Sequence, residues 1–132
     1  MTKKQLRDHR DLKKEEYQVA ELLKKCEARI YAPSTPKLDG MPHAAPNDTS
    51  AIERDVEEHI KLQKLYQEKL KAVARSALAV EQAIDALPTK ERIVCRYYYI
   101  EALTWEQVCV KINYSWSQVH RIHANALKLL SE

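Results

Sequence analysis

Hydrophobic residues recur in alternating steps of four and three along residues 50–87. The series comprises Ile52, Val56, Tyr66, Leu70, Val73, Ala77, Val80, Ile84 and Leu87, with His59 and Gln63 as polar members. This spacing is the heptad seam of a coiled coil and predicts one helix from Ser50 to Leu87. Ser50 and Glu53 have the spacing of a capping box, and Pro88 ends the helix. Further apolar residues widen the seam, so contact with more than one neighbour is expected.

A shorter helix with a broad apolar stripe is predicted over residues 3–30. The stripe comprises Tyr17, Val19, Ala20, Leu22, Leu23, Cys26 and Ile30. The first two turns are highly charged and have only Leu6 and Leu12 as apolar anchors, so we expect them to fray. The two helices should pack as an antiparallel hairpin. The longer helix then has unused seam, which predicts a homo-oligomer through the long helices or packing on the rest of the chain.

The segment 31–50 between these helices contains four of the five prolines and the only glycine. Proline removes a backbone donor and interrupts helices, so no helix is predicted here. Two interpretations are open. The segment is either an unstructured linker or an ordered loop in which Leu38 and Met41 pack against the helices.

Residues 104–123 predict two short helices joined by a tight corner. Thr104 and Gln107 have the spacing of one capping box, and Ser115 and Gln118 have the spacing of a second. Asn113 is expected at the corner in the left-handed conformation, which asparagine tolerates better than most residues other than glycine. This arrangement is typical of a helix-turn-helix, whose second helix enters the DNA major groove.

The apolar positions in this segment agree with that geometry. Val108 and Ile112 share one face of the first helix, and Val119 and Ile122 share one face of the second. The small side chain of Cys109 is expected where the helices cross.

A further helix is predicted over residues 90–101, with Thr89 as its cap after Pro88. Four of its residues are expected to pack onto the helix-turn-helix: Ile93, Val94, Tyr97 and Tyr98. Within the motif, Tyr114 is expected to fill the gap between the two helices, and Trp105 is expected to shield the hinge. The last helix runs from Trp116 to about Leu130. The sequence therefore predicts an all-α protein, with a helical hairpin at residues 1–87 and a three-helix helix-turn-helix domain at residues 88–132.

From Leu87 onward, the sequence LPTKERIVCRYYYIEALTWEQVCVKINYSWSQVHRIHANALKLL resembles region four of bacterial sigma factors. It resembles more closely the small sigma-like phage transcriptional regulators of the RinA/ArpU type. In those proteins a Leu-Pro opens a helix, a Tyr-rich segment follows, and a Leu-Thr-Trp-Glu step enters the helix-turn-helix. A weaker similarity lies in STPKLDGMP, from Ser34 to Pro42. The resemblance implies control of transcription at promoter DNA by a phage or prophage protein, with RNA polymerase as a further partner.

Two positions depart from this family's pattern. Asn113 replaces the corner glycine, and Trp116 stands where sigma factors often have a basic residue. The second departure leaves the preferred DNA sequence open.

The second helix of the motif supplies the candidate base-reading residues on the face opposite Val119 and Ile122. They are Trp116, Ser117, His120, Arg121 and Ala124. Arginine can donate two hydrogen bonds to guanine, and histidine and serine can bond bases or phosphate. Trp116 either packs on a thymine methyl group or the sugar, or packs on its own domain. The candidate phosphate contacts are Thr104, Ser115, Gln118, Lys111, Lys128, Arg92 and Arg96.

Charge adds modest support for a polyanionic partner. The formal net charge is +3, and residues 87–132 contain six Lys and Arg against four Asp and Glu. A slightly basic C-terminal segment favours nucleic-acid binding only weakly.

Other classes of function have little support in the sequence. Cys26, Cys95 and Cys109 are widely spaced, which predicts free thiols in a cytoplasmic protein. No apolar run approaches the ~20 residues that cross a bilayer, and no secretory signal is apparent. His120 and His123 lack a third metal ligand at suitable spacing. We therefore expect no enzyme activity, no cofactor, no metal and no membrane partner.

Three functions stay open at this point. The favoured one is a sequence-specific DNA-binding regulator that acts on double-stranded DNA. The alternatives are an interaction module that docks on RNA polymerase, and a phage DNA-packaging recognition subunit with oligomerising helices.

Overall fold

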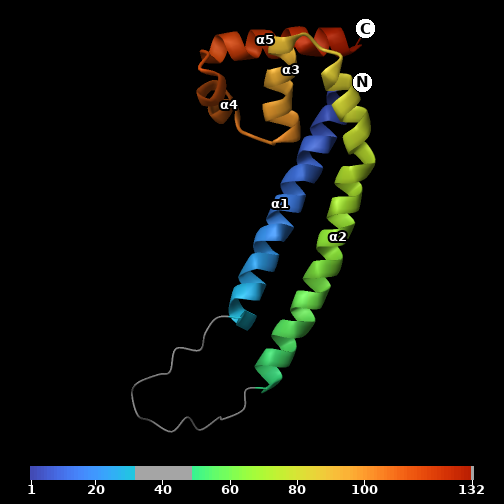
Figure 1. The fold of residues 1–132 in the computed structure, drawn as a ribbon, viewed down its shortest axis with the longest axis vertical. Helices are drawn as coiled ribbons and strands as arrows, with labels where there is room; N and C mark the ends of the chain where they lie inside the picture. Colours follow the sequence, from blue (N-terminus) through green and yellow to red (C-terminus); the bar gives the residue numbers. More distant parts are fainter. Residues whose placement is uncertain (32–48, 132) are drawn as a thin grey trace.

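The computed structural model describes residues 1–31 and 49–131, and all regular structure in these ranges is helical. The elements are α1 (Lys3–Tyr31), α2 (Thr49–Asp85), α3 (Thr89–Cys95), the π-helix η1 (Arg96–Ile100), α4 (Trp105–Ile112) and α5 (Trp116–Ser131). The predicted all-α class, with a long hairpin ahead of a helix-turn-helix, is confirmed (Figure 1). The predictions for Leu38, Met41 and the segment from Ser34 to Pro42 lie outside the described residues.

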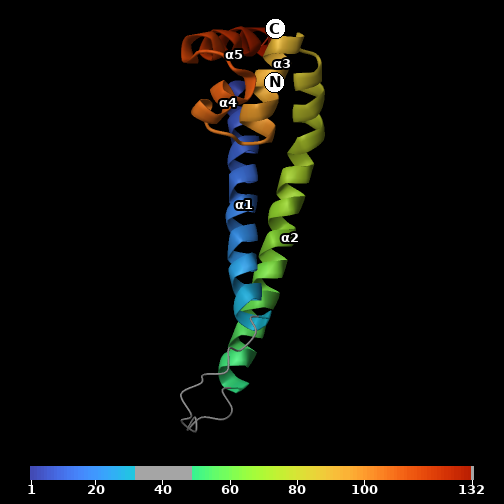
Figure 2. The ribbon, with the colours of Figure 1, turned by 60° about the vertical axis from the view of Figure 1, so that its left-hand side comes forward.

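The hairpin is formed by α1 and α2, which run antiparallel and lie side by side in both views (Figure 1, Figure 2). Much of its seam is polar. The Tyr66 hydroxyl donates to Glu16 Oε1 at 2.9 Å, and Lys69 Nζ lies 2.9 Å from Glu15 Oε2. Buried apolar residues of the heptad series gather at the end of α2 that joins the bundle, whereas Ile52 at the far end is 61% exposed. The predicted seam is therefore fully buried only where the C-terminal helices also pack on it.

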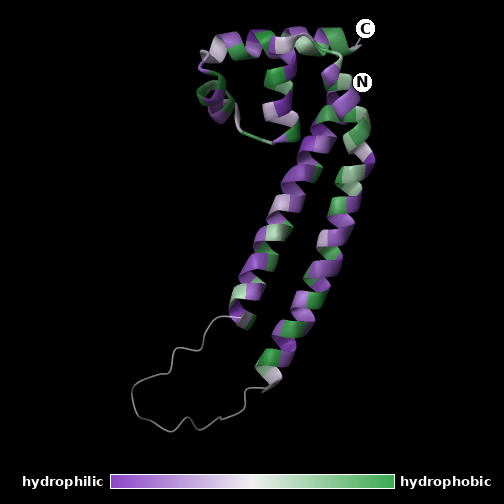
Figure 3. Cartoon of the chain, in the orientation of Figure 1, coloured by the Kyte–Doolittle hydropathy of each residue, from purple (hydrophilic) through white to green (hydrophobic). Residues whose placement is uncertain are grey.

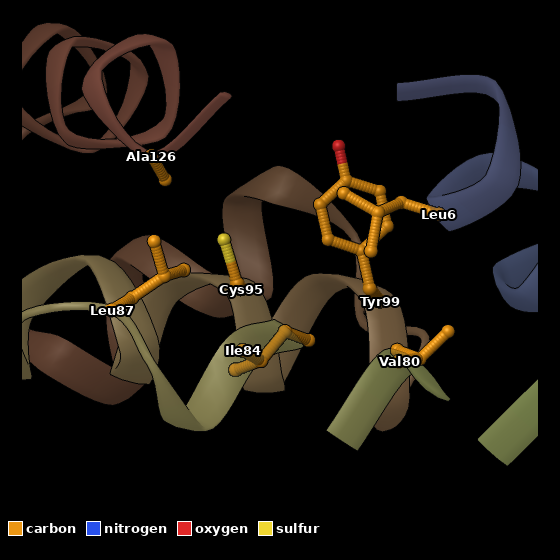
Figure 4. Packing of buried hydrophobic residues seen from close by; sticks show 7 residues of the cluster. All are labelled: Leu6, Val80, Ile84, Leu87, Cys95, Tyr99 and Ala126. Atoms are coloured by element: carbon orange, nitrogen blue, oxygen red, sulfur yellow. The ribbon is translucent and has the colours of Figure 1, made fainter. Parts of the chain in front are cut away.

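The main hydrophobic cluster lies where the hairpin meets the C-terminal helices (Figure 4). Its buried residues are Leu6, Val80, Ile84, Leu87, Cys95, Tyr99 and Ala126. Because Leu6 is fully buried in this cluster, the expectation that the first turns of α1 fray is wrong. The Met1 backbone nitrogen also donates to the Leu130 carbonyl at 3.2 Å, which ties the start of α1 to the end of α5. The hairpin and the helix-turn-helix thus share one core.

The boundaries of the connecting helices differ slightly from the prediction. α2 begins at Thr49 and ends at Asp85, one and two residues before the predicted limits. Pro88, and not Thr89, is the N-cap of α3, and no side-chain cap bond forms there. The Thr89 hydroxyl instead accepts a hydrogen bond from Arg92 Nη2 at 3.3 Å.

The predicted helix over residues 90–101 changes to π geometry after Cys95. The Glu101 amide donates to the Arg96 carbonyl, five residues earlier, at 3.0 Å. A π turn contains one residue more than an α turn, so it rotates the following side chains. Tyr99 is consequently the fully buried tyrosine, while Tyr97 and Tyr98 are only partly buried. Ile93, expected in the core, is exposed.

The chain leaves η1 through Ala102, which has a left-handed φ of 57°. The Leu103 amide donates to the Tyr97 carbonyl, six residues earlier, at 3.0 Å. The bond spans one residue more than the closing bond of a Schellman motif, in keeping with the π geometry before it, and the left-handed residue stands where glycine is usual at a helix end. The turn directs the chain into α4.

Candidate nucleic-acid interface

Both short helices of the motif begin with the predicted capping boxes. The Gln107 amide donates to Thr104 Oγ1 at 3.2 Å, and the Thr104 amide donates to Gln107 Oε1 at 2.9 Å. At the start of α5 the Gln118 amide donates to Ser115 Oγ at 3.3 Å, and the Ser115 amide donates to Gln118 Oε1 at 3.0 Å. Each box fixes the residue at which its helix starts. The predictions for these four residues as caps are confirmed.

The corner between α4 and α5 has the predicted conformation. Asn113 has φ 57° and ψ 43°, in the left-handed region. Val108 and Val119 are fully buried and meet Val94 of α3 beneath the corner. Tyr114 was expected to fill the gap between the helices, but it is about a third exposed and the valines fill that space. The space beneath the corner is therefore filled by small apolar residues.

The outward face of α5 carries an exposed polar stripe. Its members are Ser117, Arg121, Ala124, Asn125 and Lys128. Arg121 and Lys128 line a shallow groove of about 410 Å³ together with Glu91 of α3. Asn125 Nδ2 donates to Glu91 Oε1 at 2.8 Å, so this carboxylate has a partner of its own. The stripe therefore presents Ser117, Arg121 and Lys128 to an external ligand.

His120 does not lie on this outward face, contrary to the prediction. Its ring lies between two indoles, with centroids 4.7 Å from Trp105 and 4.5 Å from Trp116. The Nε2 atom is buried and has no hydrogen-bond partner among the described residues. An unpaired buried nitrogen of this kind costs roughly 1–3 kcal/mol. His120 is consequently placed to pack α5 on α4 and not to bond a base.

Trp116 packs on its own domain and is also partly exposed. One side packs on His120 of its own helix, and 51% of the residue is exposed beside Ser117. Its free surface is therefore available at the start of α5.

The predicted basic residues divide into two groups. Lys111 is exposed on α4, as Arg121 and Lys128 are on α5. Arg96 instead pairs with two carboxylates of α2, with Nη1 2.8 Å from Glu81 Oε2 and Nη2 bonded to Asp85.

These ion pairs hold Arg96 to the hairpin, so the prediction that it contacts phosphate is not supported by its position. Arg92 is partly buried and bonds Thr89 on α3. Thr104 is exposed at the start of α4 and remains positioned for a phosphate.

Sequence analysis missed Arg10, which joins α1 to this motif. Arg10 is 8% exposed, and it donates from Nε to the Tyr98 carbonyl and from Nη2 to the Leu103 carbonyl, both at 3.0 Å. Its guanidinium carbon lies 4.1 Å from the Tyr98 ring centroid. Arg10 lies 88 positions before Tyr98 and 93 before Leu103, and no local sequence pattern predicts contacts over such separations. The run of three tyrosines before two tryptophans was the only available signal.

Beneath the motif, His123 has a structural role. Its Nε2 atom lies 2.6 Å from the Tyr99 hydroxyl, and burial lowers the pKa of His123 to about 4. Burial also raises the pKa of Tyr99. A neutral imidazole and a neutral phenol therefore share a hydrogen bond inside the core. Among residues 1–31 and 49–131, no group of three His, Cys, Asp or Glu residues is placed to hold a metal ion.

Within the described helices, none combines the length and the apolar character needed to cross a membrane. Comparisons of the chain with protein-family models, curated proteins and solved structures give no match.

Proposed function

We propose that this protein binds double-stranded DNA sequence-specifically and regulates transcription at promoter DNA. The observation that carries the proposal is the exposed stripe of Ser117, Arg121 and Lys128 on α5, directly after a left-handed corner. The major groove is about 12 Å wide and admits one α-helix. A helix whose other face is buried on α3 and α4 can enter it only with this stripe toward the bases.

The proposed roles follow from position along the helices. Arg121 lies in the second turn of α5 and reads guanine through its two donors. Ser117 and the free surface of Trp116 approach the neighbouring base or sugar. The amides of Trp105 and Glu106, in the first turn of α4, bind a phosphate, because the capping box satisfies only the Gln107 amide of that turn. Lys111 and Lys128 add phosphate contacts at the two sides of the groove.

The direct test is selection of bound fragments from a random DNA pool, followed by fluorescence anisotropy on the selected site. Arg121→Ala should weaken binding to that site by roughly 1–3 kcal/mol and relax the preference at one base position. Arg75→Ala, which removes an exposed arginine on α2, is the matched control and should leave affinity unchanged. Equal, weak binding of the wild-type protein to selected and random fragments would refute sequence-specific recognition.

A second copy of the chain is the proposed partner of the hairpin. A single helix-turn-helix offers few phosphate contacts, and two copies on a repeated site multiply them. Exposed hydrophobic residues occur along α2, including Ile52 at 61% and Leu78 at 67% exposure. Figure 3 shows that hydrophobic and hydrophilic positions alternate along the whole length of α2. Analytical ultracentrifugation should show an oligomer that Leu78→Asp weakens. A wild-type monomer at high micromolar concentration would remove this part of the proposal.

The same exposed residues favour one alternative, in which the hairpin docks on RNA polymerase. In that case, capture of the polymerase should survive Arg121→Ala and fail with Leu78→Asp. Loss of capture with Arg121→Ala alone would count against it.

A further inference from the structure

The first turns of α1 contact the linker that enters the helix-turn-helix. Arg10 donates to the carbonyls of Tyr98 and Leu103, which lie on either side of the left-handed Ala102. Carbonyl groups at a helix end lack partners within the helix, and a cationic side chain satisfies them while it opposes the negative end of the dipole. Arg10 therefore fixes both the end of η1 and the approach to α4. Figure 1 shows this start of α1 against the bundle.

Tyr98 is the first of a series of contacting rings that leads away from Arg10. Tyr98 lies parallel to Trp105, with centroids 3.8 Å apart and an angle of 12° between the planes. Trp105 contacts His120, and His120 contacts Trp116. We call Tyr98, Trp105, His120 and Trp116 the aromatic column. It begins at a buried arginine of the hairpin and ends at a half-exposed tryptophan in the first turn of α5.

We propose that Arg10 is a positioning residue for α5, and that it acts through the aromatic column on the face of α5 that meets DNA. This inference rests on the proposed DNA-binding function. The hairpin and the DNA-reading helix are therefore coupled. A change in the packing of α1 on Tyr98 would alter the positions of Trp116, Ser117 and Arg121, because the rings between them are in contact. The unpaired Nε2 of His120 fits this role, because the ring packs between the two indoles although this nitrogen makes no hydrogen bond.

Two groups of contacts between α4 and α5 bear on the orientation of α5. One is the pair Val108 and Val119 beneath the corner, and the other is the aromatic column beside the DNA-facing turn. The valines fix the distance between the helices but lie below the corner. The column contacts the first and second turns of α5, where base contacts are made. Loss of the column should therefore change DNA affinity before it unfolds the domain.

The central experiment compares Arg10→Met with Arg29→Met in the full chain. Arg29 belongs to the same helix and pairs with Glu58 at 2.9 Å, far from the column, so it is the matched control. At a temperature where circular dichroism shows every variant folded, Arg10→Met should weaken DNA binding by roughly 2-fold to 30-fold, the range for residues that modulate a site indirectly. Arg29→Met should have no effect. Equal affinity of Arg10→Met and the wild type would overturn the proposal.

The salt dependence of binding separates positioning from direct contact. Removal of a phosphate-binding cation lowers the slope of log K against log salt by about 1. Arg10→Met should leave that slope unchanged, whereas Lys111→Ala should reduce it. A reduced slope for Arg10→Met would mean that Arg10 contacts DNA itself, which contradicts a positioning role.

A double-mutant cycle tests the path through the column and guards against simple destabilisation. Trp105→Leu interrupts the column without touching the hairpin. If Arg10 acts through Trp105, the combined variant should lose little more DNA affinity than either single variant, because the two changes remove one connection. Additive losses would show that Arg10 does not act along this path. Arg10→Lys, which keeps the cation but not the two-pronged donor, should fall between wild type and Arg10→Met.

A fluorescence measurement without DNA separates failure of this inference from failure of the proposed function. The chain has two tryptophans, so Trp116→Phe leaves Trp105 as the sole indole reporter. Adding Arg10→Met to that chain should shift Trp105 emission to longer wavelength and increase its quenching by acrylamide. If the wild type binds no DNA, the proposed function fails and this measurement still decides whether Arg10 holds the column. An unchanged Trp105 signal would overturn the inference in either case.

Discussion

Replacement of Leu6 by alanine tests whether the charged start of α1 is part of the core. Leu6 is fully buried in the cluster shared by the hairpin and the C-terminal helices. The substitution removes about three methylene equivalents at ~0.8 kcal/mol each, and the cavity left behind adds to that loss. We therefore expect Leu6→Ala to lower the free energy of unfolding by about 3 kcal/mol.

Leu22→Ala on the same helix is the control, because Leu22 is 50% exposed. Both substitutions make the same change in intrinsic helix propensity, so the difference between them reports burial. The control should cost less than about 1 kcal/mol, in line with surface changes. Urea unfolding followed by circular dichroism measures both values, at one protein concentration because self-association alters apparent stability.

A melting temperature roughly 10 °C lower for Leu6→Ala than for the wild type is expected from the size of the chain. If both leucine variants unfold at the same urea concentration, the start of α1 contributes nothing to the core. The reasoning that joins the hairpin to the helix-turn-helix would then be refuted.

Two further predictions concern the backbone and the buried imidazole. Ala102→Gly should stabilise the protein by up to about 1 kcal/mol, because φ at this position is 57° and glycine adopts left-handed angles without steric cost. Unchanged or lower stability in urea unfolding would contradict this prediction. Burial lowers the pKa of His123 from 6.5 to about 4, so the unfolded chain binds a proton at a higher pH than the folded chain does. The stability that this difference provides, roughly 3 kcal/mol, is fully present above pH 6.5 and should be lost as the pH falls to 4. His123→Gln, which does not titrate, should flatten thermal stability across that range, and an equally steep loss would show that other groups cause it.

The features that sequence predicted well depend on neighbours only a few residues away. The pairs Thr104 with Gln107 and Ser115 with Gln118 bond across three residues, so their spacing alone carries the geometry. Asn113 is similar, since its left-handed angles follow from the residue type at a corner. The all-α class follows from apolar periodicity in the same local way, whereas the antiparallel hairpin also required the Pro-rich segment that separates the two helices.

The features that sequence did not predict depend on distant parts of the chain. A helical wheel with α periodicity does not anticipate the π turn, which buries Tyr99 in preference to Tyr97. The wheel also placed His120 on the open face, because it contains no information about Trp105 reaching across from α4. Arg96 was assigned to DNA for the same reason, since its partners Glu81 and Asp85 belong to α2.

The length of α2 has a mechanical consequence. Its 37 residues give it a length of about 55 Å, and it is held near one end at Val80 and Ile84. A tilt of only ~10° at that end displaces the opposite end by roughly 10 Å, as follows from a rod of this length. A spin label attached near Ile52, at the far end of α2, would therefore magnify angular changes at the bundle into distances that pulsed electron resonance measures directly.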